Sequence, residues 1–353
     1  MTNELISIVL PCYRAERFLA RIIEDVLAQT YQAWELLIVS NGEGQEAQLA
    51  IARQYADKHT NIWILTSTDG GVSRARNLGM KEAKGKWLAF VDADDRITSD
   101  HLVRFIEAVA AAKEEPDIVV GGYILDQKRE GIAYNVAVPN GFKKKELILR
   151  GEDLIRGSAV NKLYRTSFAQ QFPFTSKYTM REDEIFNLTL FTKTDKIVTI
   201  PMTGYRYILA DSGNASSKYH ETLKAVLHER NSLFRTLFSQ IGLSNQEIHA
   251  IEVKESYTLS YDLVRNLFKP ENPFSFRNQC KEVKSITHQN PLLKEAIKQH
   301  CMKSESLLMK VWLFCLRSHS PLLTTIVFKL QYWFKKHFMT LFLRLWPYLS
   351  HKR

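Results

Sequence analysis

Three carboxylates follow a short apolar run in this sequence. The run covers residues 86–91, and Asp92, Asp94 and Asp95 come directly after it. Like charges this close repel one another, and each carboxylate costs free energy to remove from water. A divalent cation relieves both effects, and Mg²⁺ or Mn²⁺ commonly binds one or two carboxylates together with substrate phosphates. The spacing indicates such a site. The alternative is a solvated turn that leads into a capped helix.

A second acidic group, Glu182-Asp183-Glu184, opens a predicted helix at 183–193. A hydroxyl that attacks carbon must lose its proton, and a positioned carboxylate can accept it. The alternative is structural, because Thr179 and Glu182 have the spacing of a capping box and acids are favoured in a first helical turn. The two interpretations are compatible, since a capped helix start can also present a base.

The elements around these acids alternate between strand and helix. Short apolar runs predict strands, and apolar residues at helical spacing predict helices. The predicted strands cover 5–10, 35–39, 62–65, 86–91, 117–123, 132–138, 196–200 and 203–208, and helices follow at 46–57, 73–83 and 100–112. This order predicts an α/β, Rossmann-like fold with a mostly parallel sheet and flanking helices. Ligands of such sheets bind beyond the carboxyl ends of the strands.

Strand patterns end near residue 218, and helical patterns continue to the C-terminus. We therefore expect a catalytic domain at 1–215, a helical region at 216–309 and a basic tail at 310–353. The net charge of +10 is concentrated in that tail, which has eight Lys or Arg and no Asp or Glu. The rest of the chain carries 40 basic and 38 acidic residues, by subtraction from 48 and 38. That balance argues against nucleic acid as a partner.

The tail is amphipathic. Residues 321–347 place apolar side chains on one helical face, namely Leu323, Ile326, Val327, Leu330, Phe334, Phe338, Leu341 and Leu345. Its charge-free runs are far shorter than the roughly 20 residues of a membrane-spanning helix. The pattern fits a helix that lies on an anionic membrane surface. The alternative is a helix packed on the catalytic domain or on a second subunit.

The four cysteines, Cys12, Cys280, Cys301 and Cys315, share no close spacing that would signal a disulfide framework or a zinc site. That usage fits a reducing compartment, and the first residues show no secretory signal pattern. We therefore expect a cytoplasmic protein that lies peripherally on the inner face of the cell membrane.

Several linked motifs resemble one family. They are Ile6-Ser7-Ile8-Val9-Leu10-Pro11-Cys12-Tyr13, Gln29-Thr30-Tyr31, Glu35-Leu36-Leu37-Ile38-Val39, Arg74-Ala75-Arg76-Asn77-Leu78-Gly79 and Gly85-Lys86-Trp87-Leu88-Ala89-Phe90-Val91-Asp92-Ala93-Asp94-Asp95. In this order and spacing they resemble the family 2 glycosyltransferases of GT-A fold over roughly residues 4–210. The resemblance implies an inverting, metal-dependent enzyme. Such an enzyme moves a sugar from a nucleotide diphosphate, with UDP as the expected nucleotide, to a glycan or lipid-linked glycan of the cell surface.

The resemblance also implies roles for individual residues. Asp94 corresponds to the ligand of Mg²⁺ or Mn²⁺, and Asp92 to a contact with the ribose or with metal-bound water. Pro11 and Tyr13 would line the nucleotide pocket. Asp183 corresponds to the base that deprotonates the acceptor hydroxyl.

Two positions carry alternatives. Arg76 stands near the start of the 73–83 helix, where it could face the diphosphate or be a surface charge. After Val39 the family usually has two aspartates, whereas this chain has Ser40 and Asn41. Asn41 can both accept and donate hydrogen bonds to a nucleobase. The departure leaves open a degenerate member that acts as a glycan-binding or scaffold protein. A nucleotidyltransferase is a second alternative, because enzymes of that class on a similar α/β fold also use metal-bound carboxylates and nucleotides.

Overall fold

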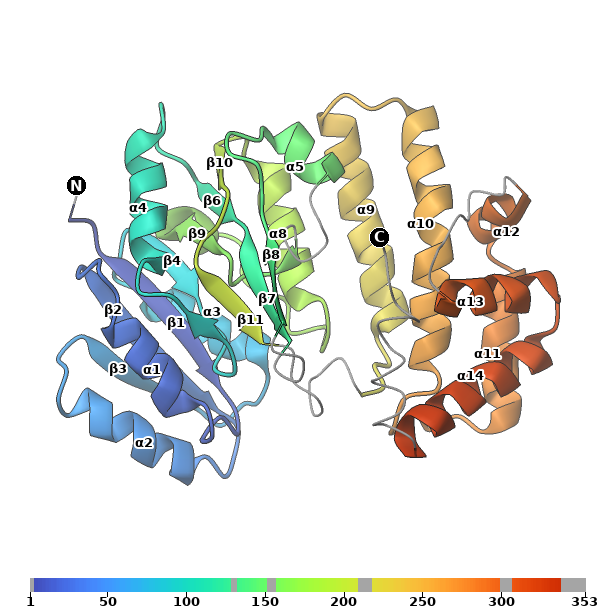
Figure 1. The fold of residues 1–353 in the computed structure, drawn as a ribbon, viewed down its shortest axis with the longest axis horizontal. Coiled ribbons are helices and arrows are strands. Elements are labelled where there is room, and N and C mark those ends of the chain that lie inside the picture. Colours follow the sequence, from blue (N-terminus) through green and yellow to red (C-terminus); the bar gives the residue numbers. More distant parts are fainter. Residues whose placement is uncertain (1–2, 128–131, 151–156, 209–217, 299–306, 338–353) are drawn as a thin grey trace. The chain divides into compact units, whose positions relative to one another are not determined.

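The computed structural model describes five stretches of the chain: residues 3–127, 132–150, 157–208, 218–298 and 307–337. The chain forms two compact units (Figure 1). The first comprises Met1–Asp211 with Ser232–Ile241, and the second comprises Ser212–Asn231 with Gly242–Arg353. The domain boundary predicted at 215 lies outside the described residues.

The first unit is built on a seven-stranded sheet of order β10-β6-β9-β4-β1-β2-β3. Its strands are β1 (Ile6–Cys12), β2 (Trp34–Asn41), β3 (Ile62–Ser67), β4 (Trp87–Phe90), β6 (Ile118–Gly121), β9 (Lys162–Arg165) and β10 (Ile197–Ile200). Every pairing is parallel except those of β9, which runs antiparallel to β4 and β6. β1, β2, β4 and β6 consist mainly of buried residues, as expected for strands covered on both faces. The predicted α/β fold with a mostly parallel sheet is confirmed.

Helices flank this sheet (Figure 1), at the predicted places for α2, α3, α4 and α8, whereas α5 and α7 were not predicted. They include α1 (Leu19–Leu27), α2 (Glu46–Ala56), α3 (Val72–Glu82), α4 (His101–Ala111), α5 (Lys144–Arg150), α7 (Thr166–Ala169) and α8 (Glu182–Lys193). Helix α3 packs on β1 and β2. Gly79 allows this close approach, because a Cβ there would lie 2.4 Å from Cγ1 of Val9. The sheet thereby positions the side chains of α3 near the ends of its central strands.

A second sheet has four short strands in the order β5-β11-β7-β8. They are β5 (Arg96–Ile97), β7 (Tyr123–Gln127), β8 (Ile132–Val136) and β11 (Tyr205–Ile208). The strand predicted at 117–123 is in fact the whole of β6 and the first residue of β7, which belong to different sheets. Gly122 separates β6 from β7, where a Cβ would lie 2.2 Å from the carbonyl oxygen of Pro201 and 2.3 Å from that of Val136.

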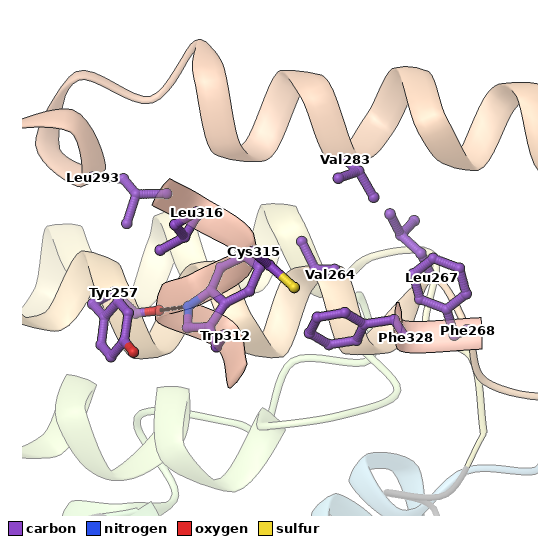
Figure 2. Close-up of a cluster of buried hydrophobic side chains, with 10 residues drawn as sticks. All are labelled: Tyr257, Val264, Leu267, Phe268, Val283, Leu293, Trp312, Cys315, Leu316 and Phe328. Carbon is purple, nitrogen blue, oxygen red and sulfur yellow. Dashed lines mark hydrogen bonds between the residues drawn. The ribbon is translucent and has the colours of Figure 1, made fainter. Parts of the chain in front are cut away.

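The second unit is helical. Its helices are α10 (Asn245–Asn266), α11 (Phe276–His288), α12 (Pro291–Lys298), α13 (Leu307–Arg317) and α14 (Pro321–His337), and α9 (Leu223–Gln240) begins in this unit. Helix α10 starts at a capping box in which Ser244 and Glu247 bond each other's backbone N–H groups. The core is one cluster of ten buried side chains shown in Figure 2: Tyr257, Val264, Leu267, Phe268, Val283, Leu293, Trp312, Cys315, Leu316 and Phe328.

The basic tail contributes directly to this core. Trp312 is fully buried, and its indole N–H donates to the carbonyl oxygen of Tyr257 at 3.2 Å (Figure 2). Phe328 of α14 contacts the ring of Trp312 edge-on. One side of these two helices therefore packs within the helical second unit, a partner that neither alternative had named. Within the described residues, no helix is long and apolar enough to cross a membrane. The predicted apolar positions beyond His337 lie outside those residues.

Candidate active site

The carboxyl ends of three neighbouring strands place the predicted site at one edge of the large sheet. In the parallel register Cys12 of β1 pairs with Ser40 of β2, and Val9 pairs with Phe90 of β4. Tyr13 follows β1 directly, Asn41 is the last residue of β2, and Asp92 comes two positions after β4. The sheet therefore brings these predicted nucleotide-binding residues to the same edge.

Tyr13 and Pro11 line the outer part of this edge. Pro11 is half-buried, whereas the Tyr13 ring is 55% exposed. The ring packs against Gly42, where a Cβ would lie 3.1 Å from its Cε2 atom, and Gly42 has a φ of +89°. The Arg14 guanidinium lies 5.2 Å from the centre of the same ring. Tyr13 thus presents an accessible aromatic face beside the end of β2.

The departure at Ser40 and Asn41 has a clear local structure. The Asn41 amide nitrogen donates to the carbonyl oxygen of Gly71 at 2.8 Å. A carbonyl can only accept, so this contact fixes which end of the amide is nitrogen. The Asn41 amide oxygen has no protein partner in the described part of the chain. Ser40 has a different role, because its hydroxyl accepts a bond of 2.7 Å from the buried amide of Gln48.

Arg76 joins the two acidic groups that the sequence singled out. Its Nη2 lies 3.0 Å from Oδ1 of Asp92, and its Nη1 lies 3.1 Å from Oε1 of Glu182. The residue is only 4% exposed. Burial lowers the pKa of Arg76, but the carboxylates of Asp92 and Glu182 outweigh it and raise the pKa above its ordinary value.

This placement rules out one of the two alternatives given for Arg76. It is not a surface charge, because it is buried, and both of its terminal nitrogens are bonded to carboxylates rather than presented to solvent. Its Nε is buried and has no hydrogen-bond partner in the described part of the chain. The sequence spacing alone could not reveal this arrangement, because Glu182 lies more than a hundred positions away.

The residues next to Arg76 explain its motif. Asn77 makes two bonds of 2.8 Å to the backbone of Phe174, donating to its carbonyl oxygen and accepting from its N–H. These bonds hold the Phe174 ring, whose centre lies 5.4 Å from the Arg76 guanidinium. Gly79, one turn further on, lets the helix lie close to β1. The residues that follow Arg76 in the motif therefore hold Phe174 against its guanidinium and hold the helix against the sheet.

The three aspartates after β4 are not equivalent. Asp95 is buried, and its carboxylate accepts from the Tyr205 hydroxyl at 2.6 Å and from the Ile208 N–H at 2.8 Å. Burial raises the pKa of Asp95 well above its usual range, and the negative charge of Asp92 adds to the shift. Asp92 and Asp94 are both partly exposed. Asp95 therefore supports the loop, while the other two aspartates remain partly accessible to solvent.

The loop is also held from behind. Arg21 of α1 donates through Nη2 to the carbonyl oxygens of Asp94 and Asp95, at 2.8 and 3.3 Å. The Tyr205 hydroxyl accepts from the Asp92 N–H at 3.2 Å while it donates to Asp95. These contacts fix the backbone from Asp92 to Asp95.

The donor set fits a divalent cation that binds with its substrate. No group of three or more His, Cys, Asp or Glu that could hold a metal occurs among the described residues. Asp92 and Asp94 are instead two partly exposed carboxylates on one fixed loop. Mg²⁺ is typically held by one or two carboxylates plus substrate phosphates rather than by a complete protein cage. The residues present match that arrangement.

Asp183 lies in the first turn of α8, next to Glu182. Burial and the charge of Glu182 together raise the pKa of Asp183 to about 7, while the charge of Arg76 acts in the opposite direction. The Glu184 N–H donates to its Oδ1 at 2.8 Å. A carboxylate with a pKa near 7 is well suited to accept a proton at neutral pH.

The capping-box alternative for this helix start is wrong. Helix α8 begins at Glu182 after Arg181, which adopts a left-handed conformation with φ 62° and provides no side-chain cap. The Glu182 carboxylate bonds to Arg76, not to the helix backbone. Two acids of this turn therefore form ion pairs with arginines, Glu182 with Arg76 and Glu184 with Arg181.

Lys162 is a buried group near Asp183 whose ionisation the sequence did not signal. It lies on β9, and its Nζ donates to the Asn161 side-chain oxygen at 2.8 Å. Burial lowers the pKa of Lys162 to about 7, and the charge of Asp183 opposes that shift. A lysine in a strand pattern gives no sign of such burial, which arises because β9 lies inside the sheet.

Known proteins match the same region. The sequence model described as Glycosyl transferase family 2 matches residues 7–172. That stretch is a family 2 glycosyltransferase domain of GT-A fold. Glycosyltransferase GlyA of Streptococcus pneumoniae is 24% identical over 257 residues, which are 69% of this chain and 36% of GlyA. The uncharacterized glycosyltransferase EpsJ of Bacillus subtilis is 23% identical over 86% of this chain and 89% of its own length.

A solved structure extends the likeness in fold. The crystal structure of S. aureus TarS residues 1–349 in complex with UDP-GlcNAc has a TM-score of 0.57 to this chain at 17% sequence identity. The alignment covers 93% of this chain and 91% of the TarS chain. The GT-A fold expected from the sequence is confirmed. The stretch matched by the family model contains Asp92 and Asp94, whereas Asp183 lies beyond it.

Proposed function

We propose that this protein is an inverting, metal-dependent glycosyltransferase. It moves a sugar from a nucleoside-diphosphate donor to a hydroxyl group of a glycan or lipid-linked glycan in cell-surface polysaccharide synthesis. The observation that carries the proposal is the Arg76 bridge, which holds Asp92 beside the donor edge and Glu182 beside Asp183. One guanidinium thus links the carboxylates that serve the donor to the candidate base.

Asp92 and Asp94 would hold Mg²⁺ or Mn²⁺ at the donor diphosphate. When bound, the metal supplies a positive charge that stabilises the leaving nucleoside diphosphate. Asp183 takes the proton of the acceptor hydroxyl while the oxygen of that hydroxyl forms a bond to the anomeric carbon. The bond from that carbon to the diphosphate breaks on the opposite side, which inverts the configuration, as expected for this family. Arg76 stays bonded to Asp92 and Glu182 and keeps the two acidic groups at a fixed separation.

Asn41 supports a UDP-linked donor. Its nitrogen is committed to the Gly71 carbonyl oxygen, so its oxygen is the atom left to meet a nucleobase. An amide oxygen can accept the imide N–H of uracil as the usual aspartate would, without contributing a negative charge. The Tyr13 ring, exposed beside Gly42, offers a stacking surface at the same edge. The UDP-GlcNAc in the TarS crystal structure, which shares this fold, supports the same donor class.

We place this activity at the cytoplasmic face of the cell membrane. The support is the eight Lys or Arg without a single acid from Lys310 to Arg353, which favours an anionic surface. A lipid-linked acceptor would be present at the same surface.

A donor screen tests the transferase proposal. The full chain is incubated with UDP-, GDP- and dTDP-sugars, with Mg²⁺, Mn²⁺ or EDTA, and released nucleoside diphosphate is measured. We expect release of nucleoside diphosphate from a UDP-sugar, and EDTA should abolish it. The Asp183→Asn variant should catalyse little of this release. UDP binding in a thermal-shift assay without release from any donor, even with mixed bacterial glycans as acceptors, would identify a binding protein. Release of pyrophosphate from a nucleoside triphosphate would identify a nucleotidyltransferase.

A further inference from the structure

Helix α14 exposes large apolar side chains along one face. Leu322, Ile326, Leu330 and Trp333 are 53, 40, 60 and 51% exposed. With 3.6 residues per turn they fall within an arc of roughly 80° around the helix axis. We call these four residues the exposed face of α14.

The opposite side of the helix is less apolar than the exposed face. Thr324, Thr325 and Phe328 are buried there. Both threonine hydroxyls donate back along their own helix, to the carbonyl oxygens of Ser320 and Pro321 at 3.0 and 2.7 Å. A surface helix of a soluble domain normally buries its most apolar side and exposes polar residues. This helix packs Phe328, Val327 and Tyr332 on the core of the second unit, yet it also leaves four large apolar side chains in solvent. Its exposed face therefore does not serve that core.

The neighbouring helix α13 contributes to the same pattern. Val311 and Phe314 are 36% and 61% exposed, while the residue after each of them, Trp312 and Cys315, is buried. Helices α13 and α14 pack against each other. Together they hold six of the twelve large apolar side chains that are exposed in the described residues. Such a concentration of exposed apolar groups marks an interaction surface.

The charges around this surface have one sign. Lys310, Arg317 and Lys329 are exposed on these two helices, and the sequence has no acidic residue after Glu305. The occupant should therefore combine negative charge with an apolar interior. A second copy of this face would bring like charges together in a symmetric contact. Residues 338–353 add three more bases and no acid, so they too would add like charge.

We propose that the exposed face of α14 docks on an anionic lipid bilayer. Leu322, Ile326, Leu330 and Trp333 enter the boundary between headgroups and acyl chains, as the apolar faces of interfacial helices do. The lysines and the arginine attract the acidic headgroups. The proposal goes beyond sugar transfer and does not depend on it, because the residues involved lie far in sequence from Asp92 and Asp183.

Point variants test this surface better than truncation. Trp312 and Phe328 belong to the core cluster, so removing the tail would unfold the second unit. The face variant is Leu330→Gln with Trp333→Gln. The matched control is Leu149→Gln with Trp63→Gln, whose side chains are 41% and 45% exposed in the first unit. All four positions are solvent-exposed, so we expect unchanged melting temperatures for both variants.

Co-sedimentation of the full chain with vesicles is the measurement. One set contains phosphatidylcholine alone, and the other contains phosphatidylcholine with about 30 mol% phosphatidylglycerol, an anionic lipid. We expect binding to the anionic set that falls with added salt. The face variant should bind about 100-fold more weakly, or roughly tenfold for each apolar side chain, while the control binds as wild type. Lys329→Gln should weaken binding about fivefold.

Other outcomes would overturn the proposal. These are failure of the wild-type chain to bind anionic vesicles, equal binding to neutral vesicles, or binding that the face variant retains. Light scattering after size-exclusion chromatography tests whether a second copy of the chain occupies this face instead. A wild-type dimer that the face variant converts to a monomer, without vesicles present, would assign the face to a second copy of the chain.

Discussion

Arg76 and Glu182 lie 106 positions apart in the sequence, and their side chains form an ion pair of 3.1 Å. The same guanidinium bonds to Asp92 at 3.0 Å. The loop after β4 and the first turn of α8 are therefore held by one rigid, planar group. Because a guanidinium forms directed bonds with fixed spacing, Arg76 holds the Asp92 carboxylate at a fixed separation from Glu182, the neighbour of Asp183.

Asp94→Asn should abolish metal-dependent transfer while the fold persists. The change removes a ligand charge and also relieves the repulsion among the three aspartates. We expect turnover at saturating donor and Mn²⁺ to fall at least about 100-fold, with an unchanged melting temperature. Asp57→Asn, an exposed acid after α2, is the control. Near wild-type turnover of Asp94→Asn would refute the metal assignment.

Asp183→Asn should remove the base and the pH dependence that belongs to it. The acid form of Asp183 cannot accept a proton, and its pKa is about 7. For the wild type we expect kcat/KM to fall about tenfold per pH unit below pH 7 and to level off above it. The variant should lose at least about 100-fold in turnover. It should also lose the fall in kcat/KM below pH 7, which we call the acidic limb. Normal turnover with weaker donor binding would instead assign Asp183 to donor binding.

Glu182→Gln and Arg76→Met should move the acidic limb in opposite directions. The Glu182 charge raises the pKa of Asp183, so removing it should shift the limb to lower pH. The Arg76 charge lowers that pKa, so Arg76→Met should shift the limb to higher pH. Both variants should also lose turnover, because each breaks the bridge. Shifts in the same direction would show that the two groups do not act on Asp183 through their charges.

Tyr205→Phe should destabilise the loop that carries the aspartates. The change leaves the Asp92 N–H and one Asp95 oxygen without the bonds of 3.2 and 2.6 Å that the hydroxyl makes. An unsatisfied buried group costs about 1–3 kcal/mol, so the free energy of unfolding in urea should fall by that amount. Tyr207→Phe is the matched control, because the Tyr207 hydroxyl makes no hydrogen bond in the described part of the chain. Equal losses in both variants would contradict the role of Tyr205.

The alternating strands and helices of the first unit could be predicted because their signals are local. The buried runs of β1, β2 and β4 and the helical spacing in α1 depend on neighbouring residues only. The chain order then placed Tyr13, Asn41 and Asp92 at strand ends, where the structure has them. The site roles assigned to these residues remain predictions, which the experiments above address.

Other features depended on contacts between distant residues. The burial of Arg76 requires Glu182, and the burial of Lys162 requires β9 to lie between β4 and β6. The separation of β6 from β7 at Gly122 follows from its close approach to Pro201 and Val136. The exposed face of α14 could not be predicted either. Leu322 and Phe328 have the same apolar character in the sequence and differ only in what packs against them. No pattern within one segment carries such information.

The antiparallel strand β9 also has a consequence for how the chain folds during synthesis. Strand β6 pairs only with β9 and β10, both of which come later in the chain. A nascent chain that has reached residue 121 can pair β1, β2, β3 and β4, but it must carry the apolar strand β6 with both edges open. Open apolar strands invite pairing with other chains. We therefore expect translational pausing or truncation between β6 and β9 to produce aggregation, whereas chains that have passed β10 can complete the sheet.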